Sequence, residues 1–373
     1  MPSEKELHIV SFDIPFPPNY GGVIDVFFKL KALQAEGARI RLHCFESSRP
    51  RSSELERYCS SVHYYKRDKR SSLLFSGKPF IVLSRRSDEL RRRLLQDRLP
   101  VLVEGLHCTA MMDDDVLRDR TCILRAHNVE HDYYNGLAAV ERRLLKRTYL
   151  RMEAAKLRKY EPVVRKSTAI AAISPDDTQY FSNTYGKTFY LPAFHPFDEV
   201  RIGRETEDFA FYHGNLSIGE NNEAACFLVR EVFSDPGIPL VIAGSNPSAE
   251  LRRLVSSRPN VALLDGLTQE EIHRHIAVAR VNVLPTFQST GIKLKLLASL
   301  FTGRHCLVNG PMVRNTGLEG LCLQADSPSQ FRERLKEIFA GLPFTDEDIQ
   351  RRKSVLEDRF SNAKNARLLL DRM

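Results

Sequence analysis

A lysine-bearing segment near the C-terminus is the part of the chain best suited to chemistry. It runs from Thr290 through Gly291 and Lys293 to Lys295, after an apolar run at Val281 to Leu284 and a proline. The pattern predicts a strand that ends in a turn and continues as a helix. Backbone N–H groups and the positive end of such a helix attract anions, and a lysine adds full charge. The segment indicates a phosphate-binding turn; the alternative is an ordinary strand–helix turn with two solvated lysines.

Glycines and a histidine follow predicted strands of the first half. Gly21 and Gly22 come after the first strand, where paired glycines let backbone approach a ligand closely. The spacing differs from the dinucleotide-binding fingerprint, so a plain turn is the alternative. His107 follows the strand Val101–Glu104 and is a candidate to bind a hydroxyl or phosphate, or to act as a base. A structural histidine is the competing interpretation.

The segment after the strand at Cys122 is denser in polar chemistry, with Arg125, His127, Asn128, Glu130 and His131 in seven positions. On a helix the two histidines, four residues apart, share one face. The order is not that of a zinc-binding HExxH helix and no third ligand is evident, so we expect no metal. A packed polar cap is one alternative. We favour a substrate-binding strand end.

Small and polar residues also follow two predicted strands of the second half. Gly214 and Asn215 end one strand, Asn222 lies at the start of the next helix, and Gly244 ends the following strand. Each feature is common in isolation. Their shared position at strand ends, together with the lysine-bearing turn, indicates a ligand-binding edge.

Strand and helix patterns alternate along the chain, which is typical of parallel α/β sheets. We expect two tandem, doubly wound, Rossmann-like domains facing a cleft, at residues 1–195 and 196–352, and a C-terminal helix at 353–373. The predicted strands are Leu7–Asp13, Ile40–Phe45, Val62–Tyr65, Val101–Glu104, Cys122–Arg125, Ala169–Ile173, Phe189–Leu191, Phe209–His213, Leu240–Ala243, Val261–Leu264, Val281–Leu284 and His305–Val308.

Composition narrows the functional class. The 373 residues are 42% hydrophobic and 27% charged, which is globular, and no apolar run approaches the roughly 20 residues of a membrane span. Seven scattered cysteines and a polar N-terminus favour a reduced, cytoplasmic chain without a zinc site.

The net charge of +8 is concentrated in the first half of the chain. Residues 1–195 hold 33 basic and 24 acidic residues, whereas 196–373 hold 22 and 23. A basic helical pattern at Arg142 to Lys166 suits an acidic substrate or an anionic membrane, and a solvated helix face is the alternative. No nucleic-acid-binding motif is evident, so we expect no nucleic acid partner.

These segments, in this order, resemble the retaining glycosyltransferases of the GT-B fold, of the group 1 or family 4 type. The similarity lies at residues 21–22, 125–130, 214–225, 241–244 and 291–299.

The resemblance implies a nucleotide-sugar donor held by the C-terminal domain and a glycan or lipid-linked acceptor held by the N-terminal domain. It implies a last helix that crosses back onto the first domain. It also implies no cofactor and no essential metal, with Lys293 neutralising the donor diphosphate and His107 contacting the transferred sugar. The donor-binding set it implies is Gly214, Asn215, Asn222, Gly244, Thr290, Gly291 and Lys295; the set for acceptor or sugar is Gly21, Gly22, Arg125, His127, Asn128 and Glu130.

The chain also departs from the family pattern. Thr290 and Ala298 stand where the family carries two glutamates, and Asn215 and Asn222 lie near the positions of its Arg and Lys pair. We expect a hexosyltransferase that acts with retention, in the cytoplasm and at the inner face of the membrane. The alternatives are a GT-B-shaped binding or scaffold protein without activity, and a non-transferase GT-B enzyme acting on sugar nucleotides.

Overall fold

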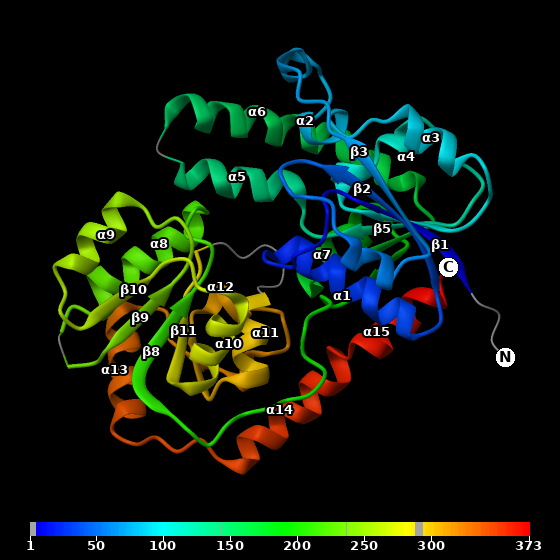
Figure 1. Ribbon diagram of the computed structural model, residues 1–373. Coiled ribbons are helices and arrows are strands. Elements are labelled where there is room, and N and C mark those ends of the chain that lie inside the picture. The colour runs from blue at the N-terminus through cyan, green and yellow to red at the C-terminus, as the bar shows by residue number, and fades with distance from the viewer. Residues whose placement is uncertain (1–4, 142, 236, 288–293) are drawn as a thin grey trace. The chain divides into compact units, whose positions relative to one another are not determined.

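The computed structural model describes residues 5–141, 143–235, 237–287 and 294–373, and these divide into two compact units (Figure 1). Unit 1 comprises the chain up to Pro196 together with Phe360–Met373. Unit 2 comprises the described residues between Phe197 and Arg359. Each unit is a parallel sheet with helices, so the predicted pair of Rossmann-like α/β domains is confirmed.

Unit 1 contains a seven-stranded parallel sheet in the order β3-β2-β1-β4-β5-β6-β7. Its strands are β1 Glu6–Ser11, β2 Arg39–Glu46, β3 Ser61–Lys66, β4 Val101–Glu104, β5 Cys122–Ala126, β6 Ala169–Ala172 and β7 Thr188–Tyr190. Its helices are α1 Gly21–Ala35, α2 Phe80–Leu83, α3 Asp88–Leu94, α4 Ala110–Asp113, α5 Glu130–Val140, α6 Leu144–Tyr160, α7 Pro175–Tyr185 and α15 Asn362–Leu370. Short helical turns are η1 Ser53–Arg57, η2 Ser71–Phe75, η3 Leu106–Cys108 and η4 Glu161–Lys166.

Both faces of this sheet are covered, which explains why its strands are apolar on both sides. Leu7 and Ile9 of β1 pack in one cluster with Leu30 of α1, while Val10 packs in the opposite cluster with Phe181 of α7. The carboxyl ends of β1, β4 and β5 are neighbours, so the segments that follow them meet at one edge.

Unit 2 contains a six-stranded parallel sheet in the order β10-β9-β8-β11-β12-β13. Its strands are β8 Glu207–His213, β9 Leu240–Ala243, β10 Val261–Leu264, β11 Ala279–Leu284, β12 His305–Val308 and β13 Leu323–Gln324. Its helices are α8 Gly219–Phe227, η5 Leu228–Val232, α9 Ala249–Ser256, α10 Gln269–Val278, α11 Leu294–Thr302, α12 Gly310–Val313, η6 Glu319–Leu321, α13 Pro328–Phe339 and α14 Asp346–Arg359. The sequence pattern missed β13, because two residues carry no periodicity.

The last described helix, α15, belongs to unit 1, in line with the expectation of a last helix that crosses back onto the first domain. Arg367 of α15 pairs with Glu36 at the end of α1 at 2.7 Å, and Asn362 Nδ2 donates to the carbonyl of His195 at 2.8 Å. Arg352 of α14 donates instead to the carbonyls of Leu300 and Gly303, so α14 stays with unit 2.

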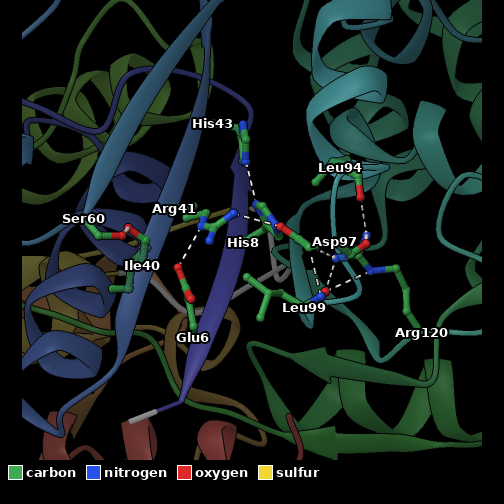
Figure 2. A network of polar contacts seen from close by, with 10 residues as sticks. All are labelled: Glu6, His8, Ile40, Arg41, His43, Ser60, Leu94, Asp97, Leu99 and Arg120. Atoms are coloured by element: carbon green, nitrogen blue, oxygen red, sulfur yellow. Dashed lines mark hydrogen bonds and ion pairs between the residues drawn. The ribbon is translucent and has the colours of Figure 1, made fainter.

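A largely buried polar chain crosses β1, β2 and β3 in unit 1, and Figure 2 shows its links from Asp97 through His8 to His43. Asp97 accepts from His8 Nε2 at 3.1 Å, and His8 Nδ1 lies 2.9 Å from His43 Nε2. His43 Nδ1 in turn lies 2.7 Å from the hydroxyl of Tyr65. Arg41 and Arg120 hold Asp97 from two sides. When both imidazoles are neutral, each hydrogen bond between successive members of the chain has one proton, so each has a donor and an acceptor.

Candidate functional sites at the sheet edges

The carboxyl edge of the unit 1 sheet places aromatic rings and histidines together. The ring of Phe12, which follows β1, lies 5.5 Å from the ring of His107 and 5.5 Å from that of His127. A Cβ on Gly22 would approach Phe12 Cζ to 2.7 Å, so this glycine lets helix α1 start against the ring. For Gly21, in contrast, no atom lies within 4 Å of the Cβ position.

Directly beneath this edge lies a buried charge network that joins α1 to β4 and β5. The ammonium of Lys29 donates to Asp25 Oδ2 at 2.9 Å and to Glu104 Oε1 at 2.7 Å. Arg125 donates to both carboxylate oxygens of Asp25, at 2.9 and 3.1 Å. His127 Nε2 lies 2.9 Å from Glu104 Oε2. Two carboxylates and two permanent cations therefore balance each other out of water.

The neighbouring cations determine whether the carboxyl groups of Asp25 and Glu104 are protonated. Burial alone would raise both pKa values, but Arg125 and Lys29 hold the pKa of Asp25 well below its usual range. Lys29 and the hydrogen bond from His127 lower that of Glu104 in the same way. Both groups stay ionised at neutral pH.

The same network contains a set of atoms with metal-ligand geometry. Oxygens of Asp25 and Glu104 and a nitrogen of His127 lie within 4.8 Å of one another. Lys29 contacts both carboxylates, so a cation already occupies the space between them. This chemistry fits an internal ion-pair network better than a metal centre.

His107 and Glu130 form a second pair at this edge. His107 Nδ1 lies 3.8 Å from Glu130 Oε1 and has no hydrogen-bond partner among the described residues. The imidazole side chain is 23% exposed, while Glu130 is 4% exposed. Burial and the positive charges of Arg85, His127 and Arg67 lower the pKa of His107, so it is neutral at pH 7. Burial and nearby Asp177 raise the pKa of Glu130 to about 8.

Two other predicted residues of this segment have different surroundings. Arg125 is fully buried and also donates to the carbonyls of Leu191 and Pro192, so it supports the edge rather than facing a ligand. Asn128 is half-buried and lines a small enclosed cavity with Glu130.

The two histidines of the segment do not share one helix face. His127 precedes α5 and bonds Glu104, whereas His131 lies on α5 and bonds Glu161 at 3.0 Å. The helix begins only at Glu130, so the four-residue spacing does not bring them together.

In unit 2, a lysine lies at the carboxyl end of β8. The ammonium of Lys295 donates to Asn221 Oδ1 at 2.6 Å and lies 5.1 Å from the ring centre of Tyr212. A Cβ on Gly214 would stand 3.2 Å from the Lys295 nitrogen. The absence of a side chain at Gly214 therefore leaves the ammonium room beside the first turn of α8. Burial and this charge lower the pKa of His213 to about 3.

The other predicted donor residues of unit 2 shape the same edge. Asn215 Oδ1 accepts from the backbone and hydroxyl of Ser217, at 3.0 and 2.6 Å. Asn222 Oδ1 accepts from Ser248 N at 3.2 Å, which ties α8 to the start of α9. A Cβ on Gly244 would stand 2.0 Å from the carbonyl oxygen of Gly214, so the two strand ends touch through glycine.

Thr290, Gly291 and Lys293 lie outside the described residues. Ala298 is buried on α11 in a cluster with Phe211 and Ile276.

Sequence reasoning missed several residues of both edges: Phe12, Asp25, Lys29, Arg85 and, as a lysine partner, Asn221. Asp25 and Lys29 carried a readable signal, since they are opposite charges four residues apart on a mainly apolar helix. Phe12 carried none, and Asn221 was singled out only as a candidate helix cap.

Comparison with known proteins identifies the fold class. No family model matches the chain. Solved structures with the GT-B fold align with nearly its whole length, and the chain has this fold. HepE of Anabaena, solved with UDP and glucose, covers 99% of both chains with a TM-score of 0.67 and 9% identity. WaaG, a glycosyltransferase involved in lipopolysaccharide biosynthesis, covers 97% of this chain and 99% of its own at TM-score 0.61 and 12% identity.

Two further comparisons concern a phosphatase domain with a similar structure and a protein with a similar sequence. The N-terminal domain of trehalose-6-phosphate phosphatase from Candida albicans covers 99% of this chain and 96% of its own, with a TM-score of 0.62 and 11% identity. An uncharacterized 44.6 kDa protein in the cps region of Klebsiella pneumoniae is 26% identical over an alignment of 312 residues, which covers 78% of this chain and 79% of that protein. None of the helices in the described parts of the chain has the length and apolar character needed to cross a membrane.

Proposed function

We propose that the protein is a glycosyltransferase of polysaccharide biosynthesis, which moves a hexose from a nucleotide sugar to a glycan or lipid-linked acceptor. The observation that carries the proposal is the ammonium of Lys295 held against Gly214 at the end of β8. In a GT-B fold this position suits ligand binding, because α/β proteins bind ligands beyond the carboxyl ends of their parallel strands.

Unit 2 is the proposed donor side. A lysine charge beside the first turn of α8 suits the diphosphate of a nucleotide sugar, since helix N-termini attract anions. Lys293, Thr290 and Gly291, predicted from the sequence, are also assigned to the proposed site. In this proposal protein cations neutralise the diphosphate, so the reaction needs no essential metal and no cofactor. That HepE was solved with UDP and glucose is consistent with such a donor.

Unit 1 is the proposed acceptor side, and His107 is its proposed contact with the transferred sugar. A neutral imidazole with 23% of its side chain exposed can donate a hydrogen bond to a sugar hydroxyl or accept one from it. Phe12 and His127 border it, and Glu130 lies behind it. We propose that the transfer retains anomeric configuration, on the family resemblance. We also propose a cytoplasmic location at the inner face of the membrane.

Ala298 favours a second candidate, a GT-B-shaped binding protein or a sugar-nucleotide enzyme that is not a transferase. Ala298 is 6% exposed and lies in a cluster with Phe209 and Phe211. It supplies no carboxylate to contact a ribose or a sugar. One neighbour with this fold has the name of a phosphatase domain, and fold alone does not fix chemistry.

Calorimetric binding of nucleotides and nucleotide sugars separates these candidates. The panel contains UDP, GDP, ADP, CMP and their common sugar conjugates, without added metal. Binding that favours one base, weakens in Lys295→Met and in Lys293→Ala, and is followed by sugar transfer supports the transferase. Binding without transfer to any acceptor favours the second candidate, and no binding across the panel contradicts a donor site.

A further inference from the structure

The helical hairpin of unit 1 exposes large apolar side chains. Helices α5 and α6 lie side by side (Figure 1), and the inner face of α6 buries Leu150, Ala154 and Leu157. Its outer face is different: Leu144 is 67% exposed, Leu145 90% and Met152 51%. Residues 145, 148, 152 and 155 fall on one side of a 3.6-residue helix, so a mainly apolar stripe runs along it.

An aromatic side chain from a distant part of the sequence joins this surface. Phe75, the last residue of η2, is 90% exposed. The ammonium of Lys156 on α6 donates to the carbonyl of Leu74 at 2.8 Å, which ties η2 to the helix. We define the lipid face as Phe75, Leu144, Leu145 and Met152.

Basic residues outnumber acidic ones in the two segments that carry the lipid face, although Lys78 pairs with Asp113 and Lys146 with Glu141. Between positions 143 and 160 the sole acidic residue is Glu153, which is buried and paired with Lys156 at 2.8 Å. Around η2, Asp68 is paired with Arg70. The basic residues of the two segments are Lys66, Arg67, Lys69, Arg70, Lys78, Arg143, Lys146, Arg147, Arg151, Lys156, Arg158 and Lys159.

This combination favours one kind of partner. Nucleic acid would match the charge but leave the apolar side chains in water. A second copy packed face to face would bring basic residues against each other, which costs free energy. An anionic bilayer surface satisfies both features, since apolar side chains enter the headgroup region while lysines and arginines meet lipid phosphates.

We propose that the lipid face docks unit 1 on membranes that contain anionic lipids. This inference deepens the proposed function and rests on it for its purpose, because a lipid-linked acceptor is presented at such a surface. The contact is peripheral and reversible, since one short amphipathic helix and a phenylalanine provide limited apolar area.

Vesicle flotation of the full chain tests the inference. We expect at least about tenfold stronger partitioning onto phosphatidylcholine vesicles with about 30 mol % phosphatidylglycerol than onto pure phosphatidylcholine, weakened by salt. Leu145→Ser combined with Met152→Ser, and separately Arg147→Gln combined with Arg151→Gln, should each reduce partitioning by about tenfold. Leu342→Ser, which changes a 37% exposed leucine of unit 2, is the matched control and should leave it unchanged.

Three results would overturn the inference: equal binding to neutral and anionic vesicles, binding unaffected by both double variants, or Leu145-dependent dimers in light scattering without vesicles. Calorimetric nucleotide binding by the same variants keeps the two proposals apart. If nucleotides bind and vesicles do not, the lipid face alone fails. If vesicles bind and no nucleotide does, the proposed transferase function fails while the docking surface stands.

Discussion

Lys295 and Asn221, 74 positions apart in the sequence, meet at 2.6 Å where β8 ends and α8 begins. The amide oxygen fixes the ammonium beside Gly214, and this arrangement leads to the first prediction. Lys295→Met should weaken binding of the preferred nucleoside diphosphate by about 10- to 100-fold, because a hydrogen bond to a charged group contributes about 1.5–3 kcal/mol. Calorimetry measures the change, and Lys336→Met, an exposed lysine of α13, is the control. Equal affinities of the two variants would remove Lys295 from the donor site.

His107→Ala should lower kcat by about 100-fold or more, as expected for loss of a positioned acid–base or polar group, with a smaller change in nucleotide affinity. The reason is that His107 belongs to unit 1, whereas the proposed nucleotide contacts belong to unit 2. Steady-state kinetics with the donor found in the binding panel measures the effect. His63→Ala, a histidine of β3, serves as control. Normal turnover in His107→Ala would make His107 structural.

Glu130 should make the protein less stable as pH rises. Its pKa is raised from 4.5 to about 8, so the folded state holds a proton that the unfolded state releases above pH 4.5. The free energy of unfolding therefore falls by up to about 1.4 kcal/mol per pH unit between about 4.5 and 8 from this group. Glu130→Gln should remove that fall, so its advantage over the wild type grows from pH 5 to pH 8. Denaturant titrations at several pH values measure it, and parallel curves for the two proteins would show that Glu130 is ionised in the folded state.

Lys29→Met should destabilise unit 1 by about 3–5 kcal/mol, the cost of leaving buried carboxylates without their cation. Asp25 and Glu104 would then keep Arg125, His127 and the backbone N–H of Phe194 as partners. Lys31→Met changes an exposed lysine on the same helix and should cost less than about 0.5 kcal/mol. Urea unfolding followed by circular dichroism compares the two variants. A Lys29→Met protein as stable as Lys31→Met would show that the network does not depend on its central ammonium.

The chain from Asp97 through His8 and His43 to Tyr65 predicts sensitivity to acid. Burial lowers the pKa of both imidazoles below 6.5, so the unfolded state binds protons that the folded state does not. The contribution of these two histidines to stability is therefore full above pH 6.5 and falls below it, by up to about 1.4 kcal/mol per pH unit for each histidine. His43→Phe should reduce this slope, measured as the free energy of unfolding from pH 7 to pH 5. An unchanged slope would mean that His43 titrates alike in both states.

The strands that position the sites were predictable because both faces of a parallel sheet are apolar, which leaves continuous runs such as Val101–Glu104 and Leu240–Ala243. His107 and Gly214 were singled out as candidates because they closely follow such runs. Their partners were not, because the Lys29–Glu104 pair joins residues 75 positions apart and depends on which strands are neighbours. The exposure of Leu145 likewise depends on which side of α6 packs against α5, and helical periodicity alone did not decide that.

The return of α15 to unit 1 has a consequence for how the protein is made. Ala366, Leu369 and Leu370 complete an apolar cluster with Leu30 and Leu33, residues translated more than 330 positions earlier. Unit 2 is in this sense an insertion within unit 1, and its synthesis is complete before that of unit 1. During translation unit 1 begins before unit 2 but is completed after it, and the α1 surface that α15 covers stays exposed until α15 has left the ribosome.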